Sequence, residues 1–297
     1  MSDPRFSEWM AQQQQRAERA LDAALPGATI APSRLHEAMR YTTLGGGKRV
    51  RPLLAFAAGE VSKACTAALE AAACAVECIH VYSLVHDDMP CMDDDSLRRG
   101  KPTVHVQYDE ATALLVGDAL QTQAFDLLSA PGLFGDASRQ LRALHTLAQA
   151  SGSRGMAGGQ AIDLGSVGKE ISLAELEVMH LHKTGALIRA AVLLGGLAGD
   201  LNDEALRQLD QYAKCIGLLF QVVDDVLDAT ADTATLGKTA GKDAANNKPT
   251  YVSLLGLSES RKLAEELARQ AEEAIATLGD RALRLREMAR YIVSRQF

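Results

Sequence analysis

Five aspartates lie within nine residues in the stretch HDDMPCMDDDSLRRGK, residues 86–101, which ends in two arginines and a lysine. Carboxylate ligands without imidazole or thiolate favour hard cations such as Mg²⁺, and arginine suits bidentate contact with phosphate. These residue types therefore indicate a site that holds metal ions and a strongly anionic ligand together. The alternative is an acidic run that is simply solvated, as most charge runs are.

The first acidic cluster follows an apolar segment that is predicted to be helical over residues 65–88. Helix C-termini carry partial negative charge, so aspartates there are disfavoured unless a cation compensates them. On a continuous helix Asp87 and Asp93 would point about 120° apart. Because Pro90 lies between them, we expect the helix to end and the bend to bring both carboxylates to one point.

A second acidic cluster, FQVVDDVLDAT, lies near the end of another helical segment. Asp224 and Asp228 are four residues apart and share a helix face, whereas Asp225 is turned about 100° away. Like charges at that spacing repel each other unless a cation lies between them. Two acidic helix ends with the same anomaly favour Mg²⁺ with a phosphorylated ligand over two solvated faces.

Basic residues are placed to complete such a site. The motif GGGKRVRP puts Lys48, Arg49 and Arg51 after three glycines, which let the backbone approach an anion closely. His80 lies two helical turns before Asp87 on nearly the same face, although a lone histidine on an apolar helix is more often a core residue. Further basic candidates are Arg98, Arg99, Lys183, Lys238 and Lys248.

The composition indicates a nearly all-α protein. Only 4% of the 297 residues are aromatic, strict apolar–polar alternation is absent, and no low-complexity segment divides the chain, so we expect one domain over residues 1–297. Helical segments are predicted at 4–25, 33–43, 52–60, 65–88, 109–129, 136–155, 173–199, 203–230 and 259–294, with a polar loop over 230–250.

Charge and cysteine content narrow the class of protein further. The net charge of −7 argues against nucleic-acid binding, which needs a basic face. An odd number of irregularly spaced cysteines and an N-terminus without a signal layout predict a reduced, cytoplasmic chain; Cys74 and Cys78 are expected in the core. The stretch ALIRAAVLLGGLAG contains Arg189 and is too short to cross a bilayer, so no membrane insertion is expected.

Six motifs resemble, in order and at about the same spacings, those of the short-chain trans-isoprenyl diphosphate synthases. They are GGGKRVRP, DDMPCMDDDSLRRGKPTVH, GGQAIDL, HKTGAL, FQVVDDVLD and GKDAANNKPTYVSLLG. The resemblance covers nearly the whole chain and is strongest to bacterial members that make farnesyl diphosphate. It implies antiparallel helices around a deep central cavity, usually in a homodimer. It also implies that an allylic diphosphate ionises and that isopentenyl diphosphate attacks the carbocation.

The resemblance also implies roles for individual residues. Asp87 and Asp93 would hold two Mg²⁺ ions and Asp224 a third, with Mn²⁺ able to substitute, while Asp88, Asp225 and Asp228 would support them through water. The allylic diphosphate would contact Arg98, Lys183 and Lys238; isopentenyl diphosphate would contact Lys48, Arg51, His80 and Arg99, and Lys248 is a further substrate contact. The Thr184 carbonyl and the Gln221 side chain would face the cation.

Product length depends on the side chains beneath the first aspartates. Tyr82 and Ser83 lie about one helical turn before Asp87, so they are the expected floor of the cavity. A tyrosine there predicts the fifteen-carbon farnesyl diphosphate, with the ten-carbon geranyl and twenty-carbon geranylgeranyl products left open.

Three other functions compete with the synthase. A class I terpene cyclase would lack the second diphosphate pocket. A phosphohydrolase that uses His86 and Asp87 would need further histidine ligands, and none stands beside a metal-like cluster. A non-catalytic regulatory subunit of a heteromeric synthase would usually lose one aspartate motif, whereas both are intact here. The synthase is therefore the preferred interpretation.

Overall fold

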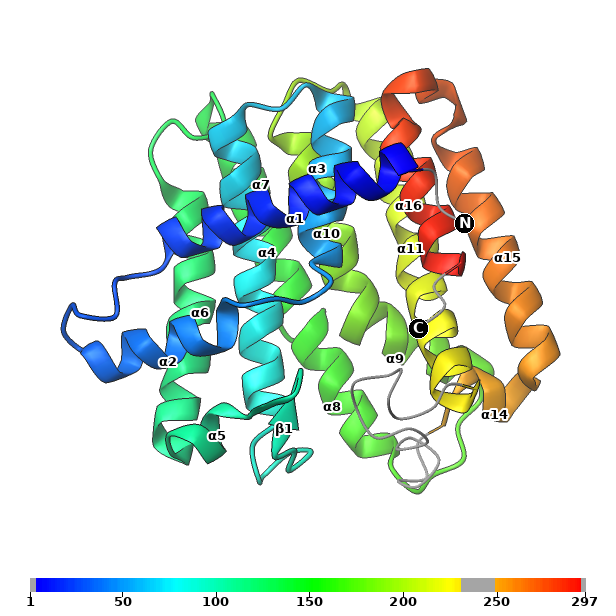
Figure 1. Cartoon of the computed structure of the whole chain (residues 1–297). Coiled ribbons are helices and arrows are strands. Elements are labelled where there is room, and N and C mark those ends of the chain that lie inside the picture. Colours follow the sequence, from blue (N-terminus) through cyan, green and yellow to red (C-terminus); the bar gives the residue numbers. More distant parts are fainter. Residues whose placement is uncertain (1–3, 231–248, 295–297) are drawn as a thin grey trace.

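The computed structural model describes residues 4–230 and 249–294, and helices dominate both ranges (Figure 1). They are α1 Pro4–Ala24, α2 Ser33–Thr43, α3 Val50–Ser62, α4 Thr66–Asp87, α5 Val104–Gln107, α6 Glu110–Ser129, α7 Ala137–Ser151, α8 Met156–Ser166, α9 Leu173–His180, α10 Ala186–Leu197, α11 Asp203–Thr230, α14 Tyr251–Leu255, α15 Leu257–Ala274 and α16 Leu283–Ser294. A π-helical turn, η1 Leu181–Gly185, joins α9 to α10, and a 3₁₀ segment, η2 Ala276–Ala282, joins α15 to α16. Within these ranges the strands are β1 Leu97–Arg98 and β2 Lys101–Pro102, so the all-α prediction is confirmed.

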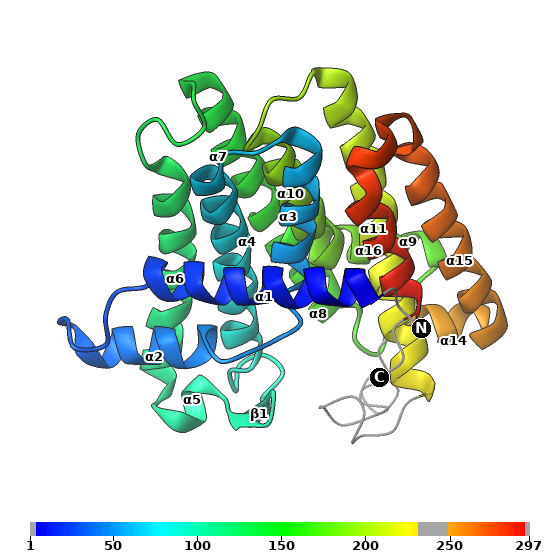
Figure 2. The same ribbon diagram turned by 45° about the horizontal axis from the view of Figure 1, so that its top comes forward.

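Helix α10 lies at the centre, where it packs against α3, α4 and α11, and α3 also packs against α4 (Figures 1 and 2). Helices α6 and α7 cover one side of this group, and α15 and α16 cover α11 on the other. Helix α1 crosses the outer face of α3 and α4 and reaches α16, where Phe6 meets Tyr291. Buried side chains such as Leu54, Ile79 and Leu187 each stabilise this core by about 1.5–3 kcal/mol.

Two predicted segments differ from the structure. The expected helix over 136–155 is wrong beyond Ser151, where α7 ends, and a separate helix, α8, begins at Met156 and was not predicted. The expected segment over 259–294 is two helices, because Gly279 adopts a left-handed backbone conformation (φ 63°) and breaks it.

Helix α4 is the one helix among the described residues that is long and apolar enough to span a membrane by length and composition alone. The more C-terminal apolar stretch ALIRAAVLLGGLAG forms α10. Of the most apolar window in α4, 72% is buried inside the protein. That burial is the pattern of a core helix, and Cys74 and Cys78 are indeed buried within it, where desolvation raises their thiol pKa values.

Candidate active site

A cavity of about 980 Å³ lies between α4, α8, η1 and α11 and is bordered by the glycine segment 45–47. Both acidic clusters and the basic candidates contribute to its wall. The predicted site residues that line it are Lys48, Arg51, His80, Tyr82, Ser83, Asp87, Arg98, Arg99, Lys183, Thr184 and Asp224. The fold therefore gathers residues from distant motifs around one space, while Lys238 and Lys248 lie outside the described residues.

The first acidic cluster is shaped by the end of α4. The helix stops at Asp87, and the chain turns back so that the backbone N–H of Asp93 donates to the Asp87 carbonyl at 2.8 Å. The bend predicted around Pro90 is thus confirmed. Burial raises the pKa of the Asp87 carboxyl to about 6; Lys183 and Arg98 oppose that shift, and the negative charge of Asp93 adds to it.

Asp88 has a different environment from its neighbour. Its carboxylate is buried and accepts hydrogen bonds from the Arg98 guanidinium, with Nε at 2.8 and 2.9 Å from the two oxygens and Nη2 at 2.5 Å. Burial raises the pKa of Asp88, and Arg98 opposes that rise. The pair fixes the orientation of Arg98 at the cavity wall.

A two-residue hairpin separates the adjacent arginines. β1 pairs with β2 so that Arg98 lies opposite Lys101, and Arg99 and Gly100 form the turn with φ of 53° and 74°. Positive φ at both central residues is the requirement of a type I′ turn. Arg98 therefore turns to Asp88, while Arg99 donates from Nη1 to the Gly46 carbonyl at 2.6 Å.

The basic corner of the cavity is built for an anion. Arg51 is half-buried, and its buried Nε has no hydrogen-bond partner in the described part of the chain. Burial and the surrounding arginines, Arg51 and Arg99 foremost, hold the pKa of His80 well below its ordinary value, so its imidazole is neutral. A buried donor without a partner among clustered cations has the chemistry to bind phosphate oxygens.

The π-helical turn η1 carries Lys183 and Thr184, and such turns often occur at functional sites. Helix α8 packs so closely on this turn that a Cβ at Gly159 would lie 2.0 Å from the backbone nitrogen of Lys183. The same helix supplies Asp163, whose carboxylate accepts from Lys183 Nζ at 2.5 Å. Asp163 was not identified from sequence, although the GGQAIDL motif that contains it was the available signal.

The second acidic cluster lies on the last turns of α11. Asp224 lines the cavity, and Asp225 and Asp228 are buried beside it. The two oxygens of Asp225 accept from the Gln221 side chain and from the Tyr251 backbone N–H, both at 2.8 Å, so this carboxylate also anchors the start of α14. The Gln221 carbonyl oxygen accepts from the Thr184 hydroxyl at 3.2 Å, which places both predicted cation-facing residues together.

The residues at the predicted floor occupy the α4 wall of the cavity. Tyr82 and Ser83 both line it, and Tyr82 is only 7% exposed. The Tyr82 ring lies edge-on to His86 with centroids 5.8 Å apart, and the Ser83 hydroxyl donates to the His80 carbonyl at 2.8 Å. Both side chains are therefore held in place at the α4 wall by contacts within the same helix.

The carboxylates fit divalent metal together with a diphosphate. Among the described residues, no three His, Cys, Asp or Glu side chains gather closely enough to hold an ion by themselves. Mg²⁺ characteristically binds one or two carboxylates and completes its coordination with water and substrate phosphate oxygens. Burial is the main cause of the raised pKa of Asp87, and the negative charges of Asp93 and Asp88 add to it; a bound cation would favour the charged carboxylate against all three effects.

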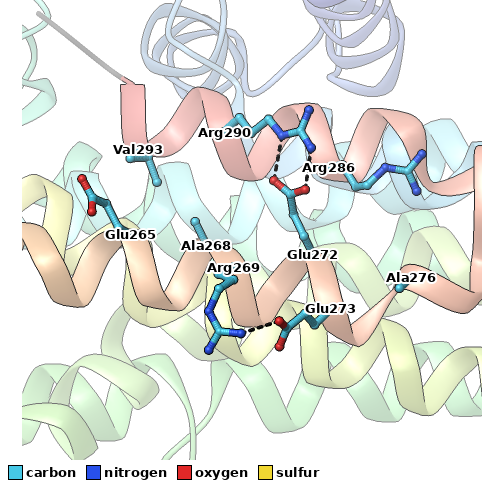
Figure 3. Close-up of a pocket in the computed structure, with 9 residues that line it drawn as sticks. All are labelled: Glu265, Ala268, Arg269, Glu272, Glu273, Ala276, Arg286, Arg290 and Val293. Atoms are coloured by element: carbon cyan, nitrogen blue, oxygen red, sulfur yellow. Dashed lines mark hydrogen bonds and ion pairs between the residues drawn. The ribbon is translucent and has the colours of Figure 1, made fainter.

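A second groove, of about 720 Å³, runs between α15 and α16 (Figure 3). Four of its charged side chains form two ion pairs: Arg290 Nη2 lies 2.6 Å from a Glu272 oxygen, and Arg269 contacts Glu273. Exposed pairs of this kind contribute little energy and need no ligand. The acidic and basic residues of the cavity, not this groove, therefore define the candidate site.

Two acidic helix ends and an arginine-rich pocket inside a helical bundle form a site whose residue types fit diphosphates together with divalent metal. Comparison with known proteins gives the family: the polyprenyl synthetase model matches residues 32–284, and the chain belongs to that family. This confirms the resemblance inferred from the motifs.

Two relatives and one solved structure illustrate the relationship. The chain is 49% identical over 285 residues to the farnesyl diphosphate synthase of Escherichia coli, covering 94% of this chain and 95% of that one. It is 47% identical over 296 residues to geranylgeranyl pyrophosphate synthase 11, chloroplastic, of Arabidopsis thaliana, covering 98% and 82%. The Helicobacter pylori geranyltransferase complexed with magnesium and isoprenyl diphosphate superimposes with a TM-score of 0.83 at 34% identity, covering 98% and 97%.

Proposed function

We propose that this chain is a Mg²⁺-dependent trans-prenyltransferase that condenses isopentenyl diphosphate with dimethylallyl and geranyl diphosphate to give farnesyl diphosphate and diphosphate. The observation that carries the proposal is the arrangement of one cavity with two different anion sites. In one site Asp87 and Asp224 lie at the cavity wall together with Arg98 and Lys183. The other site consists of the basic residues around Arg51. Two diphosphate substrates need two such sites.

In the first step the C1–O bond of the allylic diphosphate breaks and diphosphate leaves. Asp87, Asp93 and Asp224 would hold Mg²⁺, which would supply positive charge to the leaving group. Arg98 and Lys183 are fixed by Asp88 and Asp163, so they need little reorganisation as negative charge develops. Preplaced charges of this kind stabilise the transition state more than the ground state.

In the second step the double bond of isopentenyl diphosphate attacks the allylic cation and forms the new carbon–carbon bond. Lys48, Arg51, His80 and Arg99 hold the second diphosphate. The Thr184 carbonyl and the Gln221 side chain face the cation, and the departed diphosphate accepts the proton that is lost from the new chain. The bundle keeps water from the cation.

The product length follows from the α4 wall. Tyr82 is buried at the cavity wall one turn before Asp87, and this supports a fifteen-carbon product. Relatives that make geranylgeranyl pyrophosphate have similar identity, so the twenty-carbon product is the main alternative.

Several finer assignments belong to the same proposal. We assign three Mg²⁺ ions, replaceable by Mn²⁺, with Asp88, Asp225 and Asp228 as supporting residues and Lys238 and Lys248 as substrate contacts. We also propose one domain over residues 1–297 and a cytoplasmic homodimer without membrane insertion. Large exposed side chains on α5 and α6, Val106, Leu114 and Leu115, support a second copy on that face.

The test uses the purified protein with Mg²⁺, dimethylallyl diphosphate and isopentenyl diphosphate, followed by chromatography of the dephosphorylated products. The proposal expects mainly farnesol. A twenty-carbon alcohol would correct the product only, whereas no chain elongation would refute the synthase. Asp87→Ala and Asp224→Ala should each lower kcat by about 10²–10³ or more, as the loss of an electrostatic stabiliser does.

A further inference from the structure

Arg49 lies in the glycine-rich motif between two predicted diphosphate contacts, yet its side chain is turned into the protein. The guanidinium is 0% exposed. Nη1 lies 2.6 Å from Glu77 of α4, Nε lies 2.8 Å from Glu18 of α1, and Nη2 donates to the Thr43 carbonyl at 2.5 Å. Arg49 and Glu77 belong to the cavity wall, but all three partners of the guanidinium are protein groups, so it is already occupied and is not available to a ligand.

The backbone at this position is also unusual. Arg49 is the N-cap of α3 and adopts a left-handed conformation, with φ 49° and ψ 36°. Residues with a side chain avoid this region, and they stay in it when their surroundings determine the conformation. Here the fork of Arg49 joins α1, α4 and the end of α2, and that three-way contact supplies the constraint.

Helix α1 also contacts the backbone of residues 45–48, which precede Arg49. The Gln14 amide donates to the Lys48 carbonyl at 3.1 Å, and Glu18 accepts from the Gly45 backbone N–H at 3.4 Å. Lys48 and Arg51 are thereby placed at the cavity wall. The turn at Arg49 decides which way both side chains leave the backbone.

We propose that Glu18, Arg49 and Glu77 form a positioning network for the isopentenyl diphosphate pocket, which presents Lys48 and Arg51 without touching substrate. The inference rests on the proposed function, because it names the substrate of that pocket. The competing explanation is a buried ion pair that only stabilises the fold. The two differ in whether one substrate is affected selectively.

A matched ion pair offers the control. Arg16 of α1 and Glu70 of α4 join the same two helices, with Nε and Oε1 2.8 Å apart, and neither residue lines the cavity. Arg16→Lys therefore weakens an α1–α4 contact without reaching the site. Arg49→Lys keeps the charge but loses the planar fork, so it cannot hold three partners at once. Glu18→Gln removes one charge at the partly exposed end of the network.

The experiment measures KM for each substrate, kcat and the melting temperature of all four proteins. We expect Arg49→Lys to raise KM for isopentenyl diphosphate by roughly tenfold, the equivalent of one charged hydrogen bond. KM for geranyl diphosphate should change less than about twofold, and Glu18→Gln should act in the same direction more weakly. Arg16→Lys should leave both KM values unchanged.

Each outcome decides one claim. Unchanged KM values in Arg49→Lys and Glu18→Gln, or equal rises for both substrates, would overturn the positioning role. If Arg49→Lys does not fold, the selectivity of Glu18→Gln decides in its place. A wild-type protein that forms no prenyl product would instead refute the proposed function, and calorimetric titration of isopentenyl diphosphate into each protein then tests the network without turnover.

Discussion

Replacing Gly47 with alanine should weaken the second diphosphate pocket by displacing Arg99, although no charged residue is itself replaced. Gly47 has φ of 123°, and a Cβ there would lie 2.7 Å from Arg99 Cζ and Nη1. Real Cβ atoms essentially never approach a neighbour below 3.0 Å, so the Arg99 guanidinium must move. We expect this movement to break the hydrogen bond from Arg99 to the Gly46 carbonyl and to displace the guanidinium from its place at the cavity wall.

The size of the effect has two parts. The backbone strain of a non-glycine residue at this φ costs about 1–3 kcal/mol of folding free energy. Loss of a charged hydrogen bond to substrate costs about 1.5–3 kcal/mol, or roughly 10- to 150-fold in affinity. Strain lowers the melting temperature, whereas displacement of Arg99 raises KM for isopentenyl diphosphate.

Gly46 provides the control for strain. Its φ is 121°, nearly that of Gly47, but a Cβ there would meet nothing within 4 Å. Gly46→Ala should therefore lower the melting temperature by a similar few degrees and leave KM nearly unchanged. Steady-state kinetics on both variants, with Arg99→Ala and Gly47→Ala/Arg99→Ala, complete a double-mutant cycle. Equal KM values in the two glycine variants, or additive effects in the cycle, would refute the displacement of Arg99.

Three further predictions concern the other walls of the cavity. Burial raises the pKa of Asp87 from 3.8 to about 6, so the folded metal-free protein binds that proton more tightly than the unfolded chain does. Protonated Asp87 therefore contributes to the free energy of unfolding below pH 3.8, and this contribution is lost as the pH rises through 6. Thermal melting in chelator should show this loss, Asp87→Asn should reduce it, and identical pH profiles would count against the assignment. Tyr82→Ala should lengthen the product, and chromatography showing an unchanged chain-length distribution would exclude Tyr82 as the floor. Asp163→Asn should free Lys183 and raise KM for geranyl diphosphate by roughly tenfold, whereas an equal rise for isopentenyl diphosphate would argue for a general loss of structure.

The helical architecture was predictable because its signals are local. Apolar periodicity and breaks at Pro and Gly located most helices, including the end of α4 at Asp87, where Pro90 follows. Helix α8 was not predicted because Gly158 and Gly159 lower the local helix propensity. The reason for Gly159 is tertiary: its Cβ would collide with the Lys183 backbone. The contact between Gly159 and Lys183 joins segments far apart in the sequence, so it leaves no periodic pattern around Gly159 that would predict it.

The two acidic clusters were predictable for a similar reason, since their spacing and place on helix ends are local facts. The residues that hold the arginine side chains in place could not be predicted from the sequence. Arg98 and Arg99 are adjacent in sequence, yet the hairpin turn sends one to Asp88 and the other to Gly46. In that turn Arg99 adopts a left-handed backbone conformation at a position where asparagine is the usual residue, so residue preferences alone do not predict the turn.

The same limit explains the basic motif, in which Lys48, Arg49 and Arg51 look equivalent as residue types. Protein acceptors that reach a buried cation fill its hydrogen-bonding capacity, as Glu77, Glu18 and the Thr43 carbonyl together do for Arg49, and convert it into a support. Arg51 keeps a buried Nε without a partner in the described residues, so its capacity remains for a ligand. Glu77 lines the same cavity but accepts from Arg49, so in a protein with a net charge of −7 the donors left for an anion depend on which cations the acidic side chains occupy, and that distribution exists only in the folded chain.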